Sequence, residues 1–484
     1  MASLYRERFG VRPASVEPLR PDGSARSYFR LVAEGGPSVV GVLGEDVEEN
    51  EAFLSFTGTF RAEGFPVPEV YAVHDAHTAY LLTDLGDTTL FEFVARGRAE
   101  EPGGGLSEAA LQLYRQVVRW LPRFQVGGRV SIDFSVAYPR AAFDRQSILW
   151  DLHYFKYMFL KLAHIPFNEA RLEQDFASLA NFLTEAPGDY FLYRDFQSRN
   201  VMVVDGDPWF IDYQGGRRGA LQYDIASLLY DAKAELPDPV RQTLLDAYLE
   251  ALGESVAVDR EAFMRFFPAF VLVRILQAMG AYGYRGFYER KPRFLESVPI
   301  AAENVRRLLD AGSIGVLLPE LEAVLRRVTA DARFARRPEP PSGLTVTIGS
   351  FSYKHGLPAD DRGHGGGFVF DCRALLNPGR RDEFRDLTGL DPRVRGFIDA
   401  QPEAGRFWES VRALVDAQVA AYRERGFESL TVQFGCTGGQ HRSVHFAERL
   451  AEHLRPDVRV VLEHRERERW PAARAPAGQG RDVG

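Results

Sequence analysis

The sequence of 484 residues contains only two cysteines, Cys372 and Cys436, so it has neither a disulfide framework nor a four-cysteine zinc site. Its most apolar stretch, residues 266–279, is interrupted by Arg274 and is too short to cross a bilayer. Charged residues stand where a signal peptide needs an apolar segment: Arg6, Glu7 and Arg8. The formal net charge of -8 gives no general attraction for nucleic acid. We therefore expect a cytoplasmic protein with no membrane or nucleic-acid partner.

Hydrophobic residues make up 45% and charged residues 26% of the chain, the ordinary mix of a soluble globular protein. The length predicts two or three domains. A charged, proline-rich segment without periodicity predicts a stiff linker, and a final segment rich in Ala, Gly, Pro and Arg predicts disorder. The resulting division is a small lobe (1–88), a large lobe (89–335), the linker (336–343), a separate domain (344–466) and the tail (467–484).

Short strands are predicted in the first lobe, at residues 28–32, 38–42 and 79–83. From residue 106 onward, apolar residues recur at helical spacing. A small β-rich lobe followed by a larger helical lobe is typical of a bilobal nucleotide-binding enzyme.

The strongest motif of the first part lies between two apolar runs, where a polar loop contains Asp195 and Asn200. Residues 205–207 then predict a hairpin turn whose second strand ends at Asp212. Phosphoryl transfer uses one carboxylate to orient and deprotonate the attacking hydroxyl, and an amide oxygen with a second carboxylate to hold Mg²⁺. A single Asp in a loop is normally a turn residue. The three residues in this order predict kinase catalysis, with Asp195 as base and Asn200 and Asp212 as metal ligands.

Residues 193–200, 210–214 and 223–229 resemble the aminoglycoside phosphotransferase superfamily. Within it the sequence is most similar to the kinases that phosphorylate N-acetylmuramate and N-acetylglucosamine at carbon 1. The resemblance implies an α+β bilobal protein-kinase-like fold, Mg²⁺, and ATP or GTP as phosphoryl donor. The nucleotide-binding residues that it implies are Gly23, Ser24, Arg26, Arg30 and Asp84.

Two features depart from kinases in general. No G-x-G-x-x-G loop is present, and the first lysine of the chain is Lys156, so no strand of the small lobe offers a lysine to the phosphates. The amino-sugar kinases are similarly poor in lysine here. Arg26 or Arg30 is the candidate for the positive charge, and the alternative is that both are solvated charges at a strand edge.

Other polar residues have two possible roles each. Asp224 opens a helical segment and is predicted to cap it or to brace the catalytic loop. Glu51, on the first helix after the small-lobe strands, either pairs with an arginine across the site or is an exposed helix charge. Substrate contacts are expected from a helical insert that also supplies ordinary surface and core positions: Asp144, Arg145 and His153, with Asp151 and Tyr154 as further candidates.

In the domain after the linker, a strand at 430–434 precedes a glycine-rich loop at 435–443 and then a helix. Strand, glycine loop and helix N-terminus form an anion site of a smaller α/β domain, in which Arg442 can chelate phosphate oxygens. Cys436 and Arg442 also match the C-x5-R loop of cysteine phosphatases. That alternative is disfavoured because Gly435 precedes the cysteine and no acid loop is evident.

Residues 350–358, 369–373, 376–378, 387–391 and 435–443 resemble the C-terminal domain of the RNase adapter RapZ. The resemblance implies binding of glucosamine-6-phosphate or a similar phosphosugar. The contacts that it implies are Lys354, His355, Cys436, Thr437, Gly438, Gly439, His441 and Arg442. An insert at 361–367 and Gly379, in place of an expected histidine, depart from the pattern.

The two parts together suggest a kinase of N-acetylated amino sugars in peptidoglycan recycling, with a C-terminal phosphosugar sensor. A nucleotidyltransferase that acts on the product is a sensible partner. Two alternatives stay open. One is a kinase of another small alcohol, such as an aminoglycoside or a choline-like compound, for which an acidic pocket is expected. The other is an adapter or regulatory protein whose kinase fold has lost activity.

Overall fold

The computed structural model describes residues 1–19, 26–34, 36–100, 105–335, 344–358 and 367–471. The chain separates into two compact units, Met1–Arg336 and Arg337–Gly484, each with its own hydrophobic core. The division falls at the start of the segment 336–343, which lies outside the described residues, as does most of the insert 361–367.

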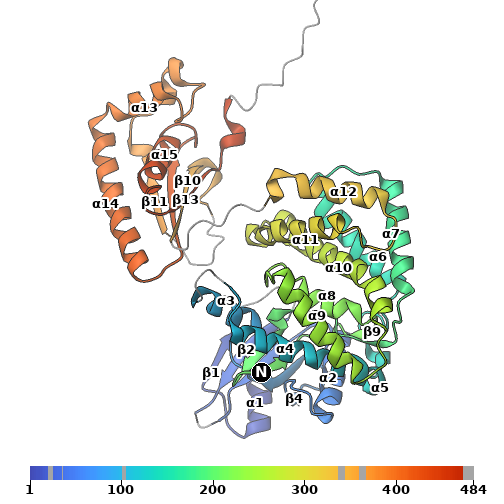
Figure 1. Cartoon of the computed structure of the whole chain (residues 1–484). Helices are drawn as coiled ribbons and strands as arrows, with labels where there is room; N and C mark the ends of the chain where they lie inside the picture. The colour runs from blue at the N-terminus through green and yellow to red at the C-terminus, as the bar shows by residue number, and fades with distance from the viewer. Residues whose placement is uncertain (20–25, 35, 101–104, 336–343, 359–366, 472–484) are drawn as a thin grey trace, which may run out of the picture. The chain divides into compact units, whose positions relative to one another are not determined.

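An antiparallel sheet forms the small lobe of the first unit (Figure 1). Its five strands lie in the order β1-β2-β3-β5-β4, with the bounds β1 Ser15–Pro18, β2 Ser27–Val32, β3 Val39–Leu43, β4 Val70–Val73 and β5 Ala79–Thr83. The strands predicted at 28–32, 38–42 and 79–83 correspond to β2, β3 and β5. Because side chains alternate along a strand, Leu31 and Leu81 pack on helix α1 (Ala2–Phe9), whereas Val40 and Val42 face a cleft on the other side.

Helix α2 (Val47–Ala62) follows β3 and joins the small lobe to the large one. Asp46 caps its start by accepting a hydrogen bond from the backbone N–H of Glu49 at 3.1 Å. Its inner face carries three phenylalanines at helical spacing: Phe53, Phe56 and Phe60. Phe53 stacks on Tyr213 of the large lobe, with ring centroids 5.4 Å apart. These rings fix the rotation of the helix against the large lobe.

The large lobe is mainly helical (Figure 1). Its helices are α3 Leu90–Glu100, α4 Glu108–Pro122, α5 Gly128–Ser131, α6 Arg145–Phe155, α7 Glu169–Thr184, α8 Gln222–Leu229, α9 Asp238–Gly253, α10 Arg260–Gly283, α11 Val298–Asp310 and α12 Pro319–Ala330. Two short antiparallel pairs carry the catalytic motif: β6 (Tyr190–Leu192) with β9 (Arg217–Gly219), and β7 (Val201–Val204) with β8 (Asp207–Phe210).

The hairpin predicted from the sequence is the pair β7–β8. Asp205 and Gly206 connect the two strands with φ angles of 53° and 89°, so both lie in the left-handed region, as a two-residue hairpin turn requires. The loop between β6 and β7 holds Asp195 and Asn200, and Asp212 follows the end of β8. The motif is therefore anchored at both ends by strand pairing.

Helix α10 forms the centre of the large lobe and contacts α6, α8 and α11. The helical stretch Arg260–Tyr288 is long and apolar enough to cross a membrane by composition, with a mean hydropathy of 1.5, but 67% of its most apolar window is buried inside the protein. The apolar stretch expected at 266–279 is thus part of a longer helix than the sequence suggested, because residues on both sides of it pack into the same core. Arg274 lies buried in the middle of this helix.

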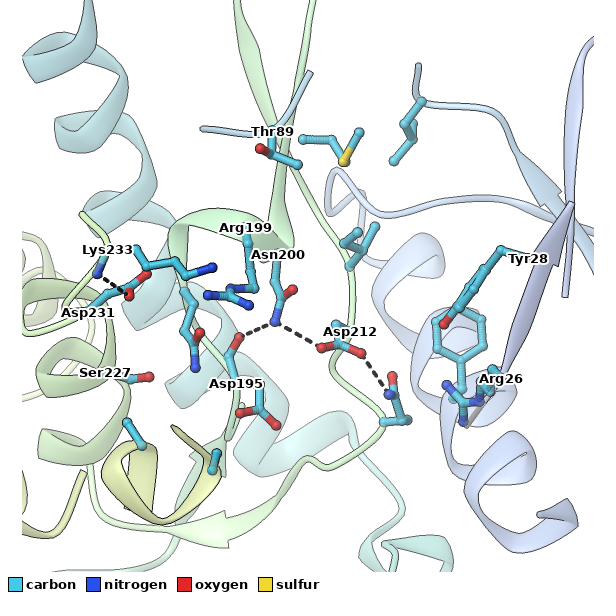
Figure 2. A pocket seen from close by; sticks show the side chains of 18 of the residues that line it. Arg26, Tyr28, Thr89, Asp195, Arg199, Asn200, Asp212, Ser227, Asp231 and Lys233 are labelled. Atoms are coloured by element: carbon cyan, nitrogen blue, oxygen red, sulfur yellow. Dashed lines mark hydrogen bonds between the residues drawn. The ribbon is translucent and has the colours of Figure 1, made fainter. Parts of the chain in front are cut away.

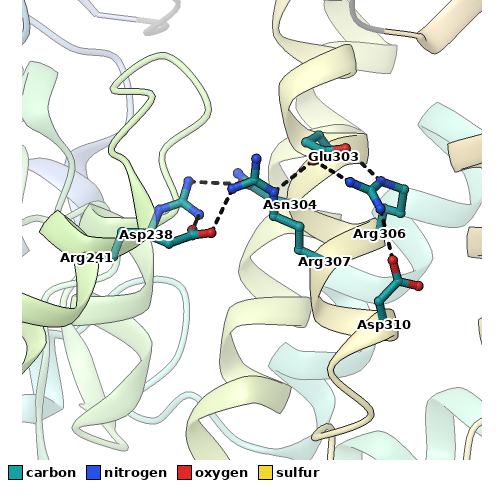
Figure 3. A network of polar contacts seen from close by, with 7 residues as sticks. All are labelled: Asp238, Arg241, Glu303, Asn304, Arg306, Arg307 and Asp310. Carbon is teal, nitrogen blue, oxygen red and sulfur yellow. Dashed lines mark hydrogen bonds and ion pairs between the residues drawn. The ribbon is translucent and has the colours of Figure 1, made fainter. Parts of the chain in front are cut away.

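Polar contacts tie α9 to α11 (Figure 3). Arg307 on α11 donates to Asp238 at the start of α9 at 2.8 Å, and the buried Arg241 on α9 donates to Asn304 at 2.9 Å. Glu303 accepts hydrogen bonds from the neighbouring arginines of α11. The exposed ion pairs of this network contribute about 1 kcal/mol or less each. The network therefore helps to fix the packing of the two helices and does not suggest a binding site.

The second unit contains a parallel sheet of four strands in the order β11-β12-β10-β13. The elements are β10 Thr345–Ser352, β11 Gly367–Asp371, α13 Pro392–Asp399, α14 Pro402–Glu424, β12 Ser429–Cys436, α15 Arg442–Leu454 and β13 Arg459–His464. Helix α15 packs on β10, β12 and β13. The strand and helix predicted around the glycine-rich loop are β12 and α15.

The predicted disordered tail begins too early. Residues Arg467–Arg469 form a short 3-10 turn, and Trp470 is only 6% exposed. The indole of Trp470 packs on His464 and donates a hydrogen bond to the carbonyl of Gly439 at 3.2 Å. The side chain of Trp470 thus packs this segment onto the domain, although the composition of the segment is typical of a disordered tail. Residues 472–484 lie outside the described residues.

Candidate functional site

A cleft of about 770 Å³ opens on the inner face of the small-lobe sheet. Side chains from β2, β3 and β5 line one side, and the loop between β6 and β7, the end of β8 and helix α10 line the other. Asp195, Asn200 and Asp212 lie together in it, with Arg26 and Tyr28 on one side and Arg199, Asp231 and Lys233 on the other (Figure 2). The three residues predicted for catalysis therefore share one cavity.

Asn200 links the backbone of Asp195 to the carboxylate of Asp212. Its side-chain Nδ2 donates to the backbone carbonyl of Asp195 at 2.8 Å and to Oδ2 of Asp212 at 2.9 Å (Figure 2). Gln214 donates to the other oxygen of Asp212 at 2.8 Å. Neither bond of Asn200 uses its amide oxygen, which leaves that oxygen as a possible ligand.

Two residues of this motif have left-handed backbone conformations although neither is glycine: Arg194 with φ of 83° and Asp212 with φ of 69°. Such a conformation costs roughly 1–3 kcal/mol at a non-glycine residue and persists only where surrounding contacts enforce it. Asp212 is one of the three residues predicted for catalysis, and Arg194 directly precedes another, Asp195; backbone strain of this kind concentrates at functional sites.

Asp224 braces the catalytic loop, as expected. Its carboxylate accepts hydrogen bonds from the backbone N–H groups of Tyr193 at 2.8 Å and Arg194 at 3.0 Å, and from the side chain of Gln125 at 3.2 Å. Burial raises the pKa of Asp224 to about 7, although the two backbone donors oppose the rise. The bonds hold the backbone immediately before Asp195 in its strained form.

Asp151 has a structural partner and does not line the cleft. Its carboxylate binds Arg194 through two hydrogen bonds of 2.7 and 2.8 Å, and Arg194 also donates to the hydroxyl of Tyr223. The residue before the catalytic aspartate is therefore fixed by its side chain as well as by its backbone.

The carboxylates of the site suit a cation. Burial, and next the negative charge of Asp195, raise the pKa of Asp212 to about 6. Mg²⁺ prefers oxygen ligands, takes few of them from the protein and completes its shell with water and phosphate oxygens. Asp212 and the amide oxygen of Asn200 fit this role. Among the described residues, no group of three or more His, Cys, Asp or Glu side chains forms a metal centre, so a site of this minimal kind is the one to consider.

Arg26 supplies the positive charge on the small-lobe side. It is 5% exposed, lines the cleft and pairs with Glu49 of α2 at 3.4 Å. In protein kinases a strand lysine and a helix glutamate form the corresponding pair. The sequence suggested Glu51 for this pair, with an exposed helix charge as the alternative. Glu51 is exposed and contacts His77, as the alternative expects. The signal for Glu49 was present, because it precedes Phe53 by four residues and so lies on the inner face of the helix.

The other nucleotide-site predictions are not supported in the same way. Arg30 pairs with Asp84 at 2.7 Å and with Asp87 at 2.8 Å, and neither Arg30 nor Asp84 lines the cleft. Their charges satisfy each other at the lobe junction, where Asp84 also accepts from the N–H of Gly86. Gly23 and Ser24 lie outside the described residues.

The three predicted substrate residues belong to other contacts. Asp144 caps α6 and pairs with Arg140, Arg145 donates to Asn181 at 2.7 Å, and His153 contacts Glu173. None of the three lines the cleft. Their role in substrate binding therefore stays a prediction without support from the cleft, because helix capping and surface ion pairs use the same residue types as substrate binding.

Sequence reasoning missed the residues that line the cleft beyond Asp195. They come from the end of α8 and the segment after it, from α10 and from the turn after α10. The polar ones are Ser227, Tyr230, Asp231, Lys233, Arg274, Gln277, Tyr282 and Arg285. They are scattered over about 60 residues without a motif. Only Arg274 gave a signal, as a charge within an apolar helix.

In the second unit, the glycine-rich loop leads from β12 to the start of α15 at Arg442. The thiol of Cys436 lies 3.1 Å from the hydroxyl of Ser443 and accepts a hydrogen bond from the N–H of Gly439 at 3.2 Å. Burial alone would raise the pKa of Cys436, but the bonds from Ser443 and Gly439 and the charge of Arg442 outweigh it and hold the pKa below the usual value. The thiol is 2% exposed, so its bonds organise the loop.

Two residues of this loop that were predicted to contact a ligand form hydrogen bonds within the protein. Arg442, 3% exposed, donates to the backbone carbonyls of Arg373 and Leu375 at 2.9 and 2.6 Å. His441 is also buried and contacts the carbonyl of Phe384 at 2.9 Å. The exposed candidates form the rim: Lys354, His355, Thr437 and Gly438. Gly439 is buried and has φ of 64°, which a glycine adopts readily.

The bilobal fold and the cleft with its paired carboxylates define a protein-kinase-like phosphotransferase. The sequence pattern of the Phosphotransferase enzyme family matches residues 15–264, which is more than half of the chain, and the chain belongs to this family. The pattern of the RapZ C-terminal domain matches residues 344–468. Both resemblances inferred from the sequence motifs are thus confirmed at the level of the family and the domain.

Two curated proteins are similar to part of this chain. A nucleotide-binding protein of Nitrosomonas eutropha is 41% identical over 145 residues, which are 30% of this chain and 46% of that protein. One from Halorhodospira halophila is 44% identical over 126 residues, 26% of this chain and 42% of that protein. The chain thus spans less than half the length of these curated relatives.

Among solved structures, choline kinase LicA from Streptococcus pneumoniae has a TM-score of 0.42 and 11% identity, over 63% of this chain and 96% of that one. An AMP-bound spectinomycin phosphotransferase has a TM-score of 0.43 and 12% identity, over 68% of this chain and 98% of that one.

Proposed function

We propose that the protein transfers the γ-phosphoryl group of Mg·ATP or Mg·GTP to the carbon-1 hydroxyl of an N-acetylated amino sugar, N-acetylmuramate or N-acetylglucosamine, in peptidoglycan recycling. The observation that carries the proposal is the convergence of Asp195, Asn200 and Asp212 in one cleft. The choice of acceptor rests on the sequence likeness of the catalytic motif to the amino-sugar kinases. We place the reaction in the cytoplasm, where nucleoside triphosphates are available.

The small-lobe side of the cleft suits a nucleotide. Val40, Leu82, Met202 and Ile211 offer apolar walls for a base, and Arg26 offers a positive charge toward the phosphates. Magnesium, held by Asn200 and Asp212, would neutralise phosphate charge. Without a strand lysine, Arg26 with its partner Glu49 is the proposed phosphate contact of the protein.

Asp195 is the proposed base. Its carboxylate takes the proton of the sugar hydroxyl while the hydroxyl oxygen forms a bond to the γ-phosphorus and the bond from that phosphorus to the β-phosphate oxygen breaks. The products are the sugar 1-phosphate and the nucleoside diphosphate. A nucleotidyltransferase that consumes a sugar 1-phosphate is the partner that this product suggests.

The first test measures phosphate transfer from Mg·ATP and Mg·GTP to N-acetylmuramate, N-acetylglucosamine, glucosamine, kanamycin and choline. We expect 1-phosphates of the N-acetyl sugars, identified by phosphorus NMR, and no product with Asp195→Asn. If kanamycin or choline alone is phosphorylated, the proposed acceptor class is wrong. Nucleotide binding without turnover on any acceptor would instead favour the adapter hypothesis.

For the second unit we propose binding of glucosamine-6-phosphate or a similar phosphosugar at the glycine-rich loop. The N-terminus of α15 and the rim residues Lys354, His355 and Thr437 support it, because they bring backbone N–H groups and positive charge to one loop. Calorimetric titration of the full chain with glucosamine-6-phosphate tests it, with Thr437→Val as the variant. Equal binding of glucosamine and glucosamine-6-phosphate would refute a phosphate site.

A further inference from the structure

The cleft beyond Asp195 is strongly basic. Four cationic side chains line that part: Arg199, Lys233, Arg274 and Arg285. Among the described residues that line it, Asp231 is the single carboxylate apart from the catalytic pair Asp195 and Asp212. Figure 2 shows Arg199, Asp231 and Lys233 on the side of the catalytic residues away from Arg26 and Tyr28. The basic part is therefore on the acceptor side of the site and not on the nucleotide side.

Asp231 offsets only part of this charge. Its two oxygens accept hydrogen bonds from the hydroxyl of Ser198 and from the backbone N–H of Lys233, both at 3.1 Å. Lys233 and Arg285 both lie against the ring of Phe294, with the cationic groups 5.9 and 5.4 Å from its centroid. The ring holds the two cations at one wall of the cleft, where Arg285 also pairs with Glu289 at 3.6 Å.

Arg274 is the most informative of the four. It is 6% exposed and sits in the middle of the apolar helix α10. Its Nε donates to the hydroxyl of Ser227 at 2.8 Å and its Nη1 donates to the amide oxygen of Gln277. Both partners are neutral, and no carboxylate pairs with Arg274 within the part of the chain that the structure describes. A buried guanidinium without an anion is costly, and an apolar residue would fit this helix better.

We propose that this part of the cleft is an anion subsite in which Arg274 binds a carboxylate or phosphate carried by the acceptor. The inference deepens the proposed function and rests on it, because it specifies which amino sugars the kinase prefers. An arginine binds either group with paired hydrogen bonds of fixed geometry. The same charges repel the ammonium groups of an aminoglycoside or choline. The acceptor class is therefore an anionic sugar, and neutral N-acetylglucosamine is the weaker substrate.

N-acetylmuramate and N-acetylglucosamine form a matched pair, since they differ only by the lactyl ether group, whose one charge is its carboxylate. In steady-state assays we expect the KM for N-acetylmuramate to be lower by about 10- to 100-fold, the effect of a hydrogen bond to a charged group. Arg274→Gln should remove the difference by raising the KM for N-acetylmuramate while that for N-acetylglucosamine stays within about twofold, and Arg274→Lys should restore part of it. Assays with N-acetylglucosamine-6-phosphate test whether Arg274 also binds a phosphate in place of the carboxylate.

Arg265→Gln is the matched control, because Arg265 lies on the same helix, is exposed and does not line the cleft. It should leave both KM values unchanged. Equal KM values for the two sugars in the wild type, or an equal rise for both in Arg274→Gln, would overturn the subsite while leaving the sugar kinase intact.

A binding measurement separates this inference from the proposed acceptor. Inorganic phosphate is titrated by calorimetry into the full chain saturated with Mg²⁺ and a non-hydrolysable ATP analogue. A saturable component that Arg274→Gln removes supports the subsite even if no sugar is phosphorylated, and identical isotherms overturn it. Lys233→Gln, at a half-exposed position, serves if Arg274→Gln does not fold, and is expected to weaken the same component.

Discussion

The two units carry polar sites of opposite character. In the cleft of the first unit, Asp195 and Asp212 are close enough for the charge of one to raise the pKa of the other, and the basic residues beyond them include a buried arginine with neutral partners only. In the loop of the second unit, Arg442 and His441 are bonded to backbone carbonyls. Both buried arginines have neutral partners, and the Nε of Arg442 is buried without a hydrogen bond among the described residues. They differ in place: Arg274 lines the cleft, whereas Arg442 holds the backbone of the neighbouring segment 373–375.

This difference shows what each kind of site does with a charged residue. A catalytic site keeps charges partly unbalanced so that substrate and metal complete them, and it gives up some stability for this. A loop that holds a ligand through backbone N–H groups must itself be rigid, so its own cations are used to fix it. The same residue type, arginine, thus points to a ligand in one unit and to the scaffold in the other.

The largest expected effect comes from Asp195→Asn. The amide keeps the shape of the side chain but cannot accept the hydroxyl proton, and loss of a general base lowers kcat by about 10²- to 10⁴-fold. Nucleotide binding, measured by calorimetry, should change little. Asp207→Asn, at an exposed position of the neighbouring hairpin, is the control and should keep full activity. A decrease in kcat of less than tenfold in Asp195→Asn would show that Asp195 is not the base. It would also weaken the contrast between the sites of the two units.

Arg442→Gln tests the scaffold role in the second unit. The change leaves the carbonyls of Arg373 and Leu375 without their charged donor, and bonds of this kind are worth about 1.5–3 kcal/mol. We expect the thermal transition of the second unit to fall by several degrees in scanning calorimetry of the full chain. Kinase turnover should not change. Half-buried Arg449 on the same helix, which donates a hydrogen bond to the side chain of Asp399, offers a control through Arg449→Gln, and an equal effect of the two variants would contradict the assignment.

The sequence predicted those parts of the fold and site that local patterns determine. The D-x4-N spacing and the Asp-Gly turn placed Asp195, Asn200 and Asp212 correctly, because a hairpin is a local structure. Glu49 was missed although the phenylalanines of α2 define its inner face. The basic residues beyond Asp195 could not be predicted, since they meet only when α10 packs against the segment after α8. The contacts of Asp144 and His153 could not be predicted either, because their partners come from helix ends and neighbouring helices.

The balance of charge in the cleft can be tested through pH. Because the pKa of Asp212 is raised to about 6 in the folded chain, its folded form favours the neutral acid. The contribution of this protonated carboxyl group to the stability of the folded chain is complete below its ordinary pKa of 3.8 and is lost as the pH rises through about 6. Without metal and nucleotide, Asp212→Asn should therefore stabilise the first unit by about 3 kcal/mol at pH 7.5 and by far less at pH 4.

The measurement is the transition temperature of the first unit, identified as the transition that Mg²⁺ with a non-hydrolysable ATP analogue raises in the wild type. Asp207→Asn should show no pH-dependent difference from the wild type. If the gain in Asp212→Asn were the same at both pH values, the carboxylate would not carry an electrostatic cost in the metal-free cleft.

The smallest expected effect belongs to the rim of the second site. Lys354 is exposed, so a charge contact with a phosphosugar is screened by solvent and is worth about 1 kcal/mol or less. Lys354→Gln should weaken the binding of glucosamine-6-phosphate by about two- to fivefold, with a decrease in the salt dependence of the affinity. Arg455→Gln, remote in sequence at the end of α15, is the control. A loss of a hundredfold would mean that Lys354 is desolvated in the complex, and the second site would then resemble the first in depending on an unbalanced charge.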